Sequence, residues 1–148
     1  MKINGIAHVA LTIRRMEVSA PFYESLLGFL EFVCVHRSER MTYFIGGRTA
    51  IALQSAQTGE ARPPFSQSQV GLHHLCFRAY AREDVDRFHE HLLAIDAKVV
   101  HAPEDGTWAP GYYSVLFEDP DGIRLEMNYV PGSGVLADGV QFVPKGYE

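Results

Sequence analysis

Three residues with metal-binding side chains occupy separate apolar segments of the chain: His8, His74 and Glu126. Two imidazoles and one carboxylate form the donor set of divalent metal sites that keep open positions for water or substrate. A carboxylate in the middle of an apolar strand is also costly unless it is paired or bound to a cation. The three residues therefore predict a metal centre. The alternative for Glu126 is a salt bridge to Arg78 or Arg124.

Strand alternation decides which side chains reach such a site. Neighbouring residues of a strand point to opposite faces, so the adjacent pair His73 and His74 cannot both face one pocket. Because a helix needs an apolar sheet face to cover, Leu75 and Phe77 should lie beneath a helix, with His73 on their side. His74 is then left on the opposite face, and the same alternation places Glu126 there.

An internal repeat brings His8 into the same site. Two segments of the first half recur 66 residues later. The segment 8-HVALTI-13 matches 74-HLCFRA-79, and 22-FYESLLGF-29 matches 88-FHEHLLAI-95. Chance similarity of two amphipathic helices is the alternative. A histidine at the same offset in the preceding strand favours duplication instead. Two units packed about a pseudo-two-fold axis would bring His8 and His74 together.

Each half reads as strand, helix and three strands. The expected helices span about 17–28 and 83–95, with apolar stripes on Val18, Phe22 and Leu26 and on Val85, Phe88 and Leu92. Gly28 is the expected stop of the first helix, and Pro21 should lie in its first turn. The expected strands span about 4–13, 30–35, 41–45, 49–54, 71–79, 97–100, 112–117 and 123–130. The modules cover residues 1–55 and 71–130, joined by a linker at 56–70 and followed by a tail at 131–148.

Composition narrows the class of partner. The chain has 148 residues and a formal net charge of −5, with no cluster of Lys or Arg, which argues against nucleic acid or an anionic membrane as the main partner. No apolar run has membrane-spanning length, and no signal peptide is recognisable. We therefore expect a cytoplasmic protein in which Cys34 and Cys76 are buried free thiols.

These motifs, with 119-DPDGIRLEM-127, resemble the vicinal oxygen chelate superfamily, which contains glyoxalases, bleomycin-resistance proteins and extradiol dioxygenases. The resemblance covers about residues 4–130. It implies an α+β fold in which two βαβββ modules form a cupped mixed sheet within one structural domain. It also implies a divalent metal held by His8, His74 and Glu126, and a homodimer in which two chains sometimes build each site.

One departure from the family bears on the reaction. Glyoxalase-I-type members carry a fourth ligand, usually a glutamate, near the end of the first module. Here that strand reads 49-TAIALQ-54, which places Ala52 at the position of Glu126 and leaves Gln54 one step further along. The departure favours three-ligand subgroups, among them extradiol dioxygenases and fosfomycin-modifying transferases. Whether Gln54 itself binds metal stays open.

The leading hypothesis is a metal-dependent enzyme acting on a small substrate that chelates the metal through two adjacent oxygens. Extradiol-type dioxygenase chemistry with Fe(II) comes first, and Mn, Ni or Zn are the other metals considered. The alternatives are a lactoylglutathione-lyase-like isomerase or lyase and a non-catalytic protein that binds a small molecule such as an antibiotic. Tyr113 is the candidate acid or base if its strand neighbours that of Glu126, otherwise a packed aromatic. Arg78 is the candidate binder of a substrate carboxylate, or else a partner of Glu126.

Overall fold

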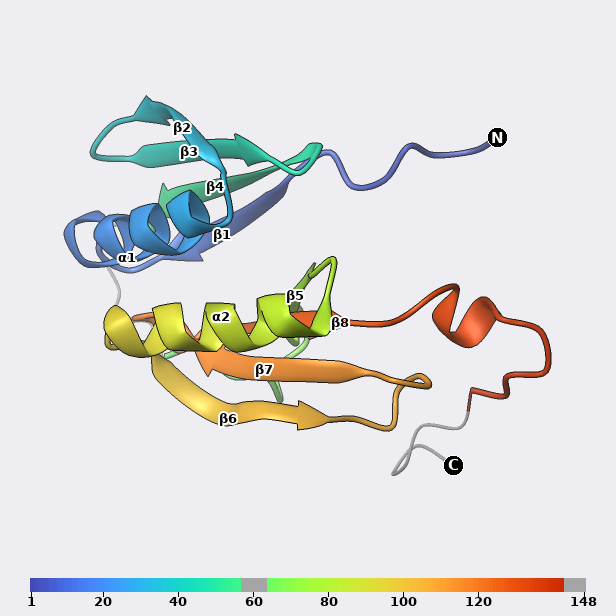
Figure 1. The fold of residues 1–148 in the computed structure, drawn as a ribbon. Helices are drawn as coiled ribbons and strands as arrows, with labels where there is room; N and C mark the ends of the chain where they lie inside the picture. The colour runs from blue at the N-terminus through green and yellow to red at the C-terminus, as the bar shows by residue number, and fades with distance from the viewer. Residues whose placement is uncertain (57–63, 143–148) are drawn as a thin grey trace. The chain divides into compact units, whose positions relative to one another are not determined.

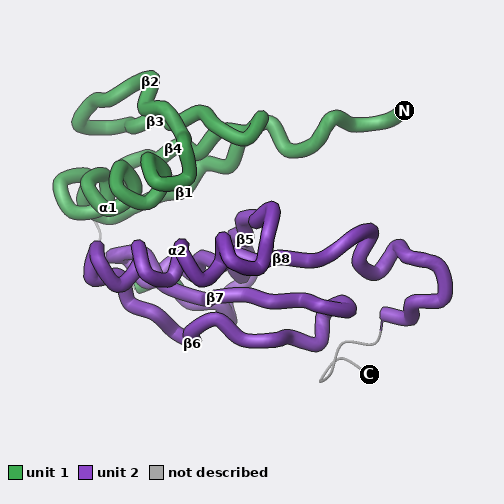
Figure 2. Tube along the Cα trace, in the orientation of Figure 1, with its two compact units in different colours: residues 1–65 green, residues 66–148 purple. Residues whose placement is uncertain are grey.

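The computed structural model describes residues 1–56 and 64–142, which form two compact units, Met1–Phe65 and Ser66–Glu148 (Figures 1 and 2). The first unit contains β1 (Val9–Ile13), α1 (Met16–Phe29), β2 (Val33–Arg37), β3 (Met41–Gly46) and β4 (Thr49–Ser55). The second contains β5 (Leu75–Arg78), α2 (Arg82–Ala94), β6 (Lys98–Asp105), β7 (Tyr113–Glu118) and β8 (Arg124–Tyr129), followed by the short 3-10 helix η1 (Gly134–Leu136). Residues 57–63 of the predicted linker lie outside the described residues.

The two units share one topology. Their four-stranded sheets run β1-β4-β3-β2 and β5-β8-β7-β6. In each sheet the first and last strands of the unit are parallel neighbours, and the other pairings are antiparallel. The predicted α+β class with a doubled βαβββ unit is therefore confirmed.

Each unit has its own apolar core between its helix and one face of its sheet. In the second unit, the rings of Phe88 on α2 and Phe117 on β7 meet edge to face, with centroids 5.5 Å apart. The largest contributors to the first core are Leu11, Ile13, Tyr23, Leu26, Leu27, Phe44, Ile51 and Leu53. Those of the second core are Val85, Phe88, Leu92, Val115, Phe117, Ile123, Leu125 and Met127. Neither α-helix among the described residues is long and apolar enough to span a membrane.

The repeat slips by one residue inside α1, which corrects the predicted apolar stripe of that helix. The residues before the two helices, Arg15 and Ala81, keep the offset of 66, but α1 has 14 residues and α2 has 13. The buried faces therefore correspond at an offset of 65, with Ala20, Tyr23 and Leu27 matching Val85, Phe88 and Leu92. Of the predicted stripe of α1, Leu26 is buried, whereas Phe22 is only half-buried and Val18 is exposed.

The predicted stop of the first helix at Gly28 is also wrong, because Gly28 lies within α1 and Pro21 lies beyond its first turn. Each helix is instead followed, two residues after its last residue, by an acidic residue in the left-handed conformation: Glu31 with φ 62° after α1 and Asp96 with φ 54° after α2. The following N–H closes the helix in each case, from Phe32 to the Leu27 carbonyl and from Ala97 to the Leu92 carbonyl, both at 2.9 Å. This arrangement is a Schellman motif, in which glycine is the usual left-handed residue.

We predict that Glu31→Gly and Asp96→Gly each stabilise the fold by about 0.5–1 kcal/mol, because the left-handed conformation strains a residue with a Cβ more than glycine's extra backbone freedom costs. Urea unfolding measures the change. Glu90→Gly within α2 is the matched control and should lower the free energy of unfolding by about 1 kcal/mol. Destabilisation by both cap variants would contradict the assignment of strain.

Candidate metal and substrate site

A tight turn precedes β8, the strand that carries Glu126. Asp119 is buried, and its Oδ1 accepts hydrogen bonds from the backbone N–H groups of Asp121 and Ile123, both at 2.8 Å. Gly122 takes φ 84°, a conformation that favours glycine. The turn fixes the start of β8, so that Leu125 and Met127 enter the core and Glu126 faces the other side of the sheet, as predicted.

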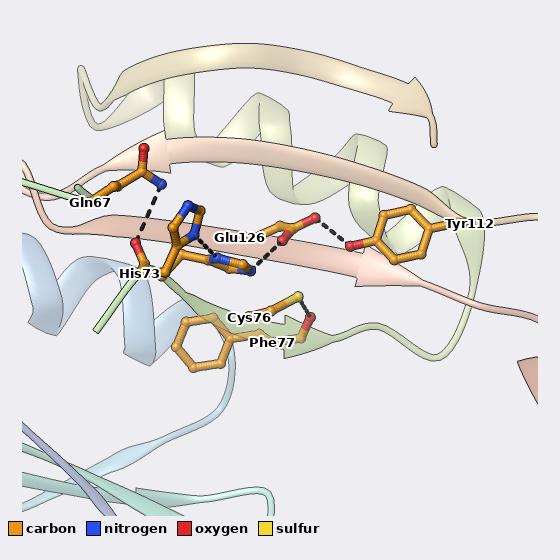
Figure 3. Close-up of polar contacts among 7 residues, drawn as sticks. Gln67, His73, Cys76, Phe77, Tyr112 and Glu126 are labelled. Atoms are coloured by element: carbon orange, nitrogen blue, oxygen red, sulfur yellow. Dashed lines mark hydrogen bonds and ion pairs between the residues drawn. The ribbon is translucent and has the colours of Figure 1, made fainter. Parts of the chain in front are cut away.

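Glu126 is buried, with 7% of its surface exposed, and polar groups surround its carboxylate. The Tyr112 hydroxyl donates to Oε1 at 2.6 Å, and His74 Nε2 lies 3.1 Å from Oε2 (Figure 3). Cys76 is the neighbour of Glu126 in the parallel β5–β8 pair, and its thiol interacts with the same carboxylate. The structure therefore brings two of the three predicted metal ligands together in the second unit.

His73 does not face the helix layer, and this prediction is wrong. Strand β5 begins only at Leu75, so alternation does not govern the two residues before it. Both histidines are exposed, their rings meet edge to face with centroids 5.0 Å apart, and His73 Nδ1 lies 2.8 Å from His74 Nδ1. The Gln67 amide donates to the His73 carbonyl at 3.3 Å. His73 thus engages one nitrogen of His74 and leaves Nε2 directed at Glu126.

Tyr113 lies on the helix side of its strand, away from Glu126. Its hydroxyl donates to Asp86 Oδ1 at 2.6 Å, and the Arg82 guanidinium stacks 3.5 Å from its ring centroid. The hydrogen bond to Asp86 raises the pKa of Tyr113. Tyr113 pairs in register with Tyr129, and alternation along β8 puts Tyr129 on the same face as the core residues of that strand. Its neighbour Tyr112 therefore takes the place beside Glu126 that was expected for Tyr113.

The loop before β7 is shaped to hold Tyr112. The Gly106 N–H donates to the Tyr112 carbonyl at 2.9 Å, and a Cβ on Gly106 would lie 2.7 Å from the Tyr112 ring. Only a residue without a side chain permits that approach. Loss of hydration raises the pKa of the Tyr112 phenol, and the adjacent Glu126 raises it further. The phenol is therefore a hydrogen-bond donor to Glu126 at neutral pH.

Both cysteines are exposed free thiols, which corrects the prediction that they are buried. Cys76 sits on the Glu126 face of β5. Although it keeps contact with solvent, partial loss of hydration raises the pKa of its thiol, and the Glu126 charge raises it further. Cys76 therefore stays protonated at neutral pH and supplies Glu126 with another polar neighbour.

The first unit repeats the register of this site without its carboxylate. His8 is exposed and immediately precedes β1, as His74 immediately precedes β5. Ala10 pairs with Ala52 in the way that Cys76 pairs with Glu126, so Ala52 occupies the position of the acid. Gln54 corresponds in the same way to Asn128. The predicted placement of Ala52 at the position of Glu126 is thus confirmed by strand register.

The pair His74 and Glu126 fits a divalent metal ion. Ligand atoms about 2.1 Å from a metal are separated by about 3.0–3.4 Å when they occupy neighbouring coordination positions, and the observed separation is 3.1 Å. Within residues 1–56 and 64–142, no three His, Cys, Asp or Glu side chains gather closely enough to hold a metal. Two donors of the appropriate type are in place, and a metal ion requires at least one more.

Arg78 lies further along the same face of β5, where it pairs in register with Asn128. It makes no ion pair with Glu126, which was one of the two roles considered for it. Instead it lines a pocket of about 470 Å³ together with Tyr112, Asn128 and Trp108. Trp108 was not singled out in the sequence, because no motif marks it, whereas strand alternation places Asn128 on the face of Glu126. The pocket lies next to the carboxylate site, since Tyr112 contributes to both.

The doubled βαβββ topology defines the class of fold. A model of the Glyoxalase/Bleomycin resistance protein/Dioxygenase superfamily matches residues 5–127, and the chain belongs to that superfamily. It is 29% identical over 136 residues to the metallothiol transferase FosB of Shouchella clausii, covering 92% of this chain and 84% of that protein.

Solved structures agree with this assignment. A candidate glyoxalase from Bacillus halodurans superposes with a TM-score of 0.74 and 28% identity, over 86% of this chain and 96% of that one. A lactoylglutathione lyase from Agrobacterium tumefaciens gives a TM-score of 0.66 and 25% identity, over 86% of this chain and 95% of that one. The superfamily thus includes lyases, transferases and dioxygenases, and membership alone leaves the reaction open.

The two adjacent tyrosines provide a matched pair of variants. We predict that Tyr112→Phe weakens divalent-metal binding roughly 10- to 100-fold, because it removes the donor that orients the Glu126 carboxylate. Tyr113→Phe should leave metal affinity unchanged and lower the free energy of unfolding by about 1 kcal/mol through loss of the bond to Asp86. Calorimetric metal titration and urea unfolding measure the two effects. The reverse pattern would place the site on the helix side of β7.

Proposed function

We propose that this protein is a metal-dependent enzyme acting on a small substrate that chelates a divalent metal through two adjacent oxygens. The observation that supports it most is the convergence of His74 Nε2 and the buried Glu126 Oε2 at 3.1 Å on one sheet face. A histidine beside a buried carboxylate is a characteristic donor pair for Fe(II), Mn, Ni or Zn. Fe(II) is the first choice because a site with few protein ligands leaves positions for substrate and dioxygen.

We propose His8 as the third ligand. It holds the same position before β1 that His74 holds before β5, in units of identical topology. This third ligand comes from the same chain, or from a second copy of the chain if the protein assembles. We infer a homodimer, because family members often form dimers. In either arrangement, replacing His8 should reduce metal binding, so the proposal can be tested without knowing the assembly.

The chain's own residues have separable roles in this proposal. A bound divalent ion supplies Lewis acidity that polarises substrate oxygens. Tyr112 holds one oxygen of Glu126 and leaves the other directed toward His74. His73, at 2.8 Å from His74 Nδ1, fixes the ring orientation and tautomer of a ligating histidine. These neighbours make the carboxylate and the imidazole available in a single geometry.

Extradiol-type dioxygenase chemistry remains the first choice for the reaction. Support comes from Ala52 in the register position of Glu126, since a lyase of the glyoxalase I type has an additional acidic ligand near this strand. The second candidate is thiol transfer, which the similarity to a metallothiol transferase favours. The lyase reaction is the third, on the similarity to a lactoylglutathione lyase.

Metal content tests the site directly. We expect about one divalent ion per chain in the purified protein and loss of most of it in His74→Ala and Glu126→Ala, because a site deprived of one of three protein ligands binds its ion far more weakly. His8→Ala should show the same loss. Elemental analysis of the dialysed proteins gives the result.

His89→Ala, which removes a histidine from α2, is the matched control and should retain the ion. Circular dichroism establishes that each variant is folded. Metal content unaffected by His74→Ala would refute the site, whereas loss in His74→Ala with full retention in His8→Ala would refute only the third ligand.

The reaction is tested on the Fe(II)-loaded protein. We expect oxygen uptake with at least one member of a catechol panel, abolished by Glu126→Ala. An oxygen electrode measures the uptake, with His89→Ala as the active control. Absence of uptake across the panel, combined with metal-dependent consumption of a thiol in the presence of an epoxide, would replace ring cleavage by thiol transfer.

A further inference from the structure

Arg78 differs from the other cations of its unit. Among the described residues from 64 to 142, every other Lys or Arg pairs with a carboxylate: Arg82 with Asp105, Arg87 with Asp84, and Lys98 and Arg124 with Glu118. Arg78 has no such partner in this part of the chain. In a protein of net charge −5, acidic residues are plentiful, so an unpaired guanidinium on the wall of a pocket indicates a site for an external anion.

The pocket around Arg78 has the size and lining of a small-molecule site. Its volume of about 470 Å³ lies within the roughly 300–1,000 Å³ typical of ligand pockets. Tyr112, Asn128 and Arg78 form its polar wall. The remaining wall comes mainly from apolar or small residues, among them Trp108, Val130, Leu136 and Phe142.

The segment after β8 is fitted closely against this wall. Gly134 takes φ 54°, and a Cβ there would lie 2.8 Å from Val130 Cγ1. Gly111, in the loop before β7, takes φ 70°, and a Cβ there would lie 2.7 Å from Pro131 Cγ. Two glycines thus allow the loop and the C-terminal segment to meet around the pocket.

Two aromatic residues at the pocket expose much of their surface. Trp108 is 43% exposed and Phe142 is 56% exposed, and their ring centroids are 6.4 Å apart at an interplanar angle of 33°. Both rings are therefore accessible from solvent, and a bound ligand could cover their apolar faces. A pocket lined by both aromatic rings and a guanidinium suits a ligand with an apolar part and an anionic part.

We propose that this pocket binds a small organic anion whose carboxylate or phosphonate group pairs with Arg78 and whose apolar part contacts Trp108 and Phe142. The inference deepens the proposed function, since it assigns the substrate class of the adjacent metal site. Arg78 is two residues from Cys76, the register partner of Glu126, which corresponds to roughly 7 Å along the strand. One ligand of modest size therefore reaches from Arg78 to the His74–Glu126 pair.

The chain's single tryptophan makes the pocket directly observable, because Trp108 fluorescence reports on this pocket alone. The probes are benzoate, phenylphosphonate and uncharged benzamide, titrated into EDTA-treated protein at an excitation wavelength that selects tryptophan. Benzoate or phenylphosphonate should change the emission saturably and bind at least about tenfold more tightly than benzamide, because charge-assisted pairs with a guanidinium are the stronger ones. The better of the two anions identifies the head group.

Arg78→Gln should weaken anion binding at least about tenfold and leave benzamide unaffected. Arg87→Gln, which removes the same charge from α2, is the matched control and should bind as the parent does. Phe142→Ala should shift the free emission to longer wavelength and weaken all three probes. Unchanged anion binding in Arg78→Gln, or equal loss in Arg87→Gln, would overturn the proposal.

The metal-free condition separates this inference from the proposed function. Anion binding that appears only after a divalent metal is added would show that the metal holds the anion, which overturns the role of Arg78 while supporting the metal site. Anion binding in EDTA that depends on Arg78, in a protein whose metal content is insensitive to His74→Ala, would support the pocket while refuting the metal site.

Discussion

The burial of the Glu126 carboxylate is the constraint on which the local structure depends. A carboxylate in a sheet keeps its charge only if donors or a cation replace the lost water. Here Tyr112 and His74 approach its two oxygens, and the Cys76 thiol lies beside it. The close approach of Gly106 to the Tyr112 ring is a consequence, because the loop must fold back far enough to bring the phenol to the acid. The histidine pair before β5 serves the same carboxylate, because His73 contacts His74 and His74 Nε2 lies beside Glu126.

The two units show how one topology carries different chemistry. Their strand orders and registers correspond, yet Ala52 and Gln54 stand where Glu126 and Asn128 stand in the second unit, and Thr12 stands where Arg78 stands. The backbone therefore does not require polar residues on this face. The second unit carries a buried acid there at a cost in desolvation. Further along the same face lies Arg78, an exposed cation with no carboxylate partner among residues 64–142.

Sequence patterns predicted the elements, their order, the buried face of α2 and the side of β8 on which Glu126 lies, because period and alternation alone determine these. They failed where a one-residue difference mattered. The apolar stripe of α1 was misplaced because that helix contains one residue more than α2. Tyr113 was the predicted site tyrosine and Tyr112 was missed, because the register of β7 against β8 is not visible in either strand alone. His73 was placed by strand alternation although it precedes the strand.

Tyr112 joins the two parts of the site, which has a consequence for how they work together. Its hydroxyl donates to Glu126, its side chain interacts with Asn128, and it also lines the pocket beside Arg78. A ligand that displaces the phenol toward Glu126 or away from it alters the donor that sets the carboxylate geometry. Under the proposed function, occupation of the pocket and metal coordination by Glu126 are coupled through this one hydrogen bond.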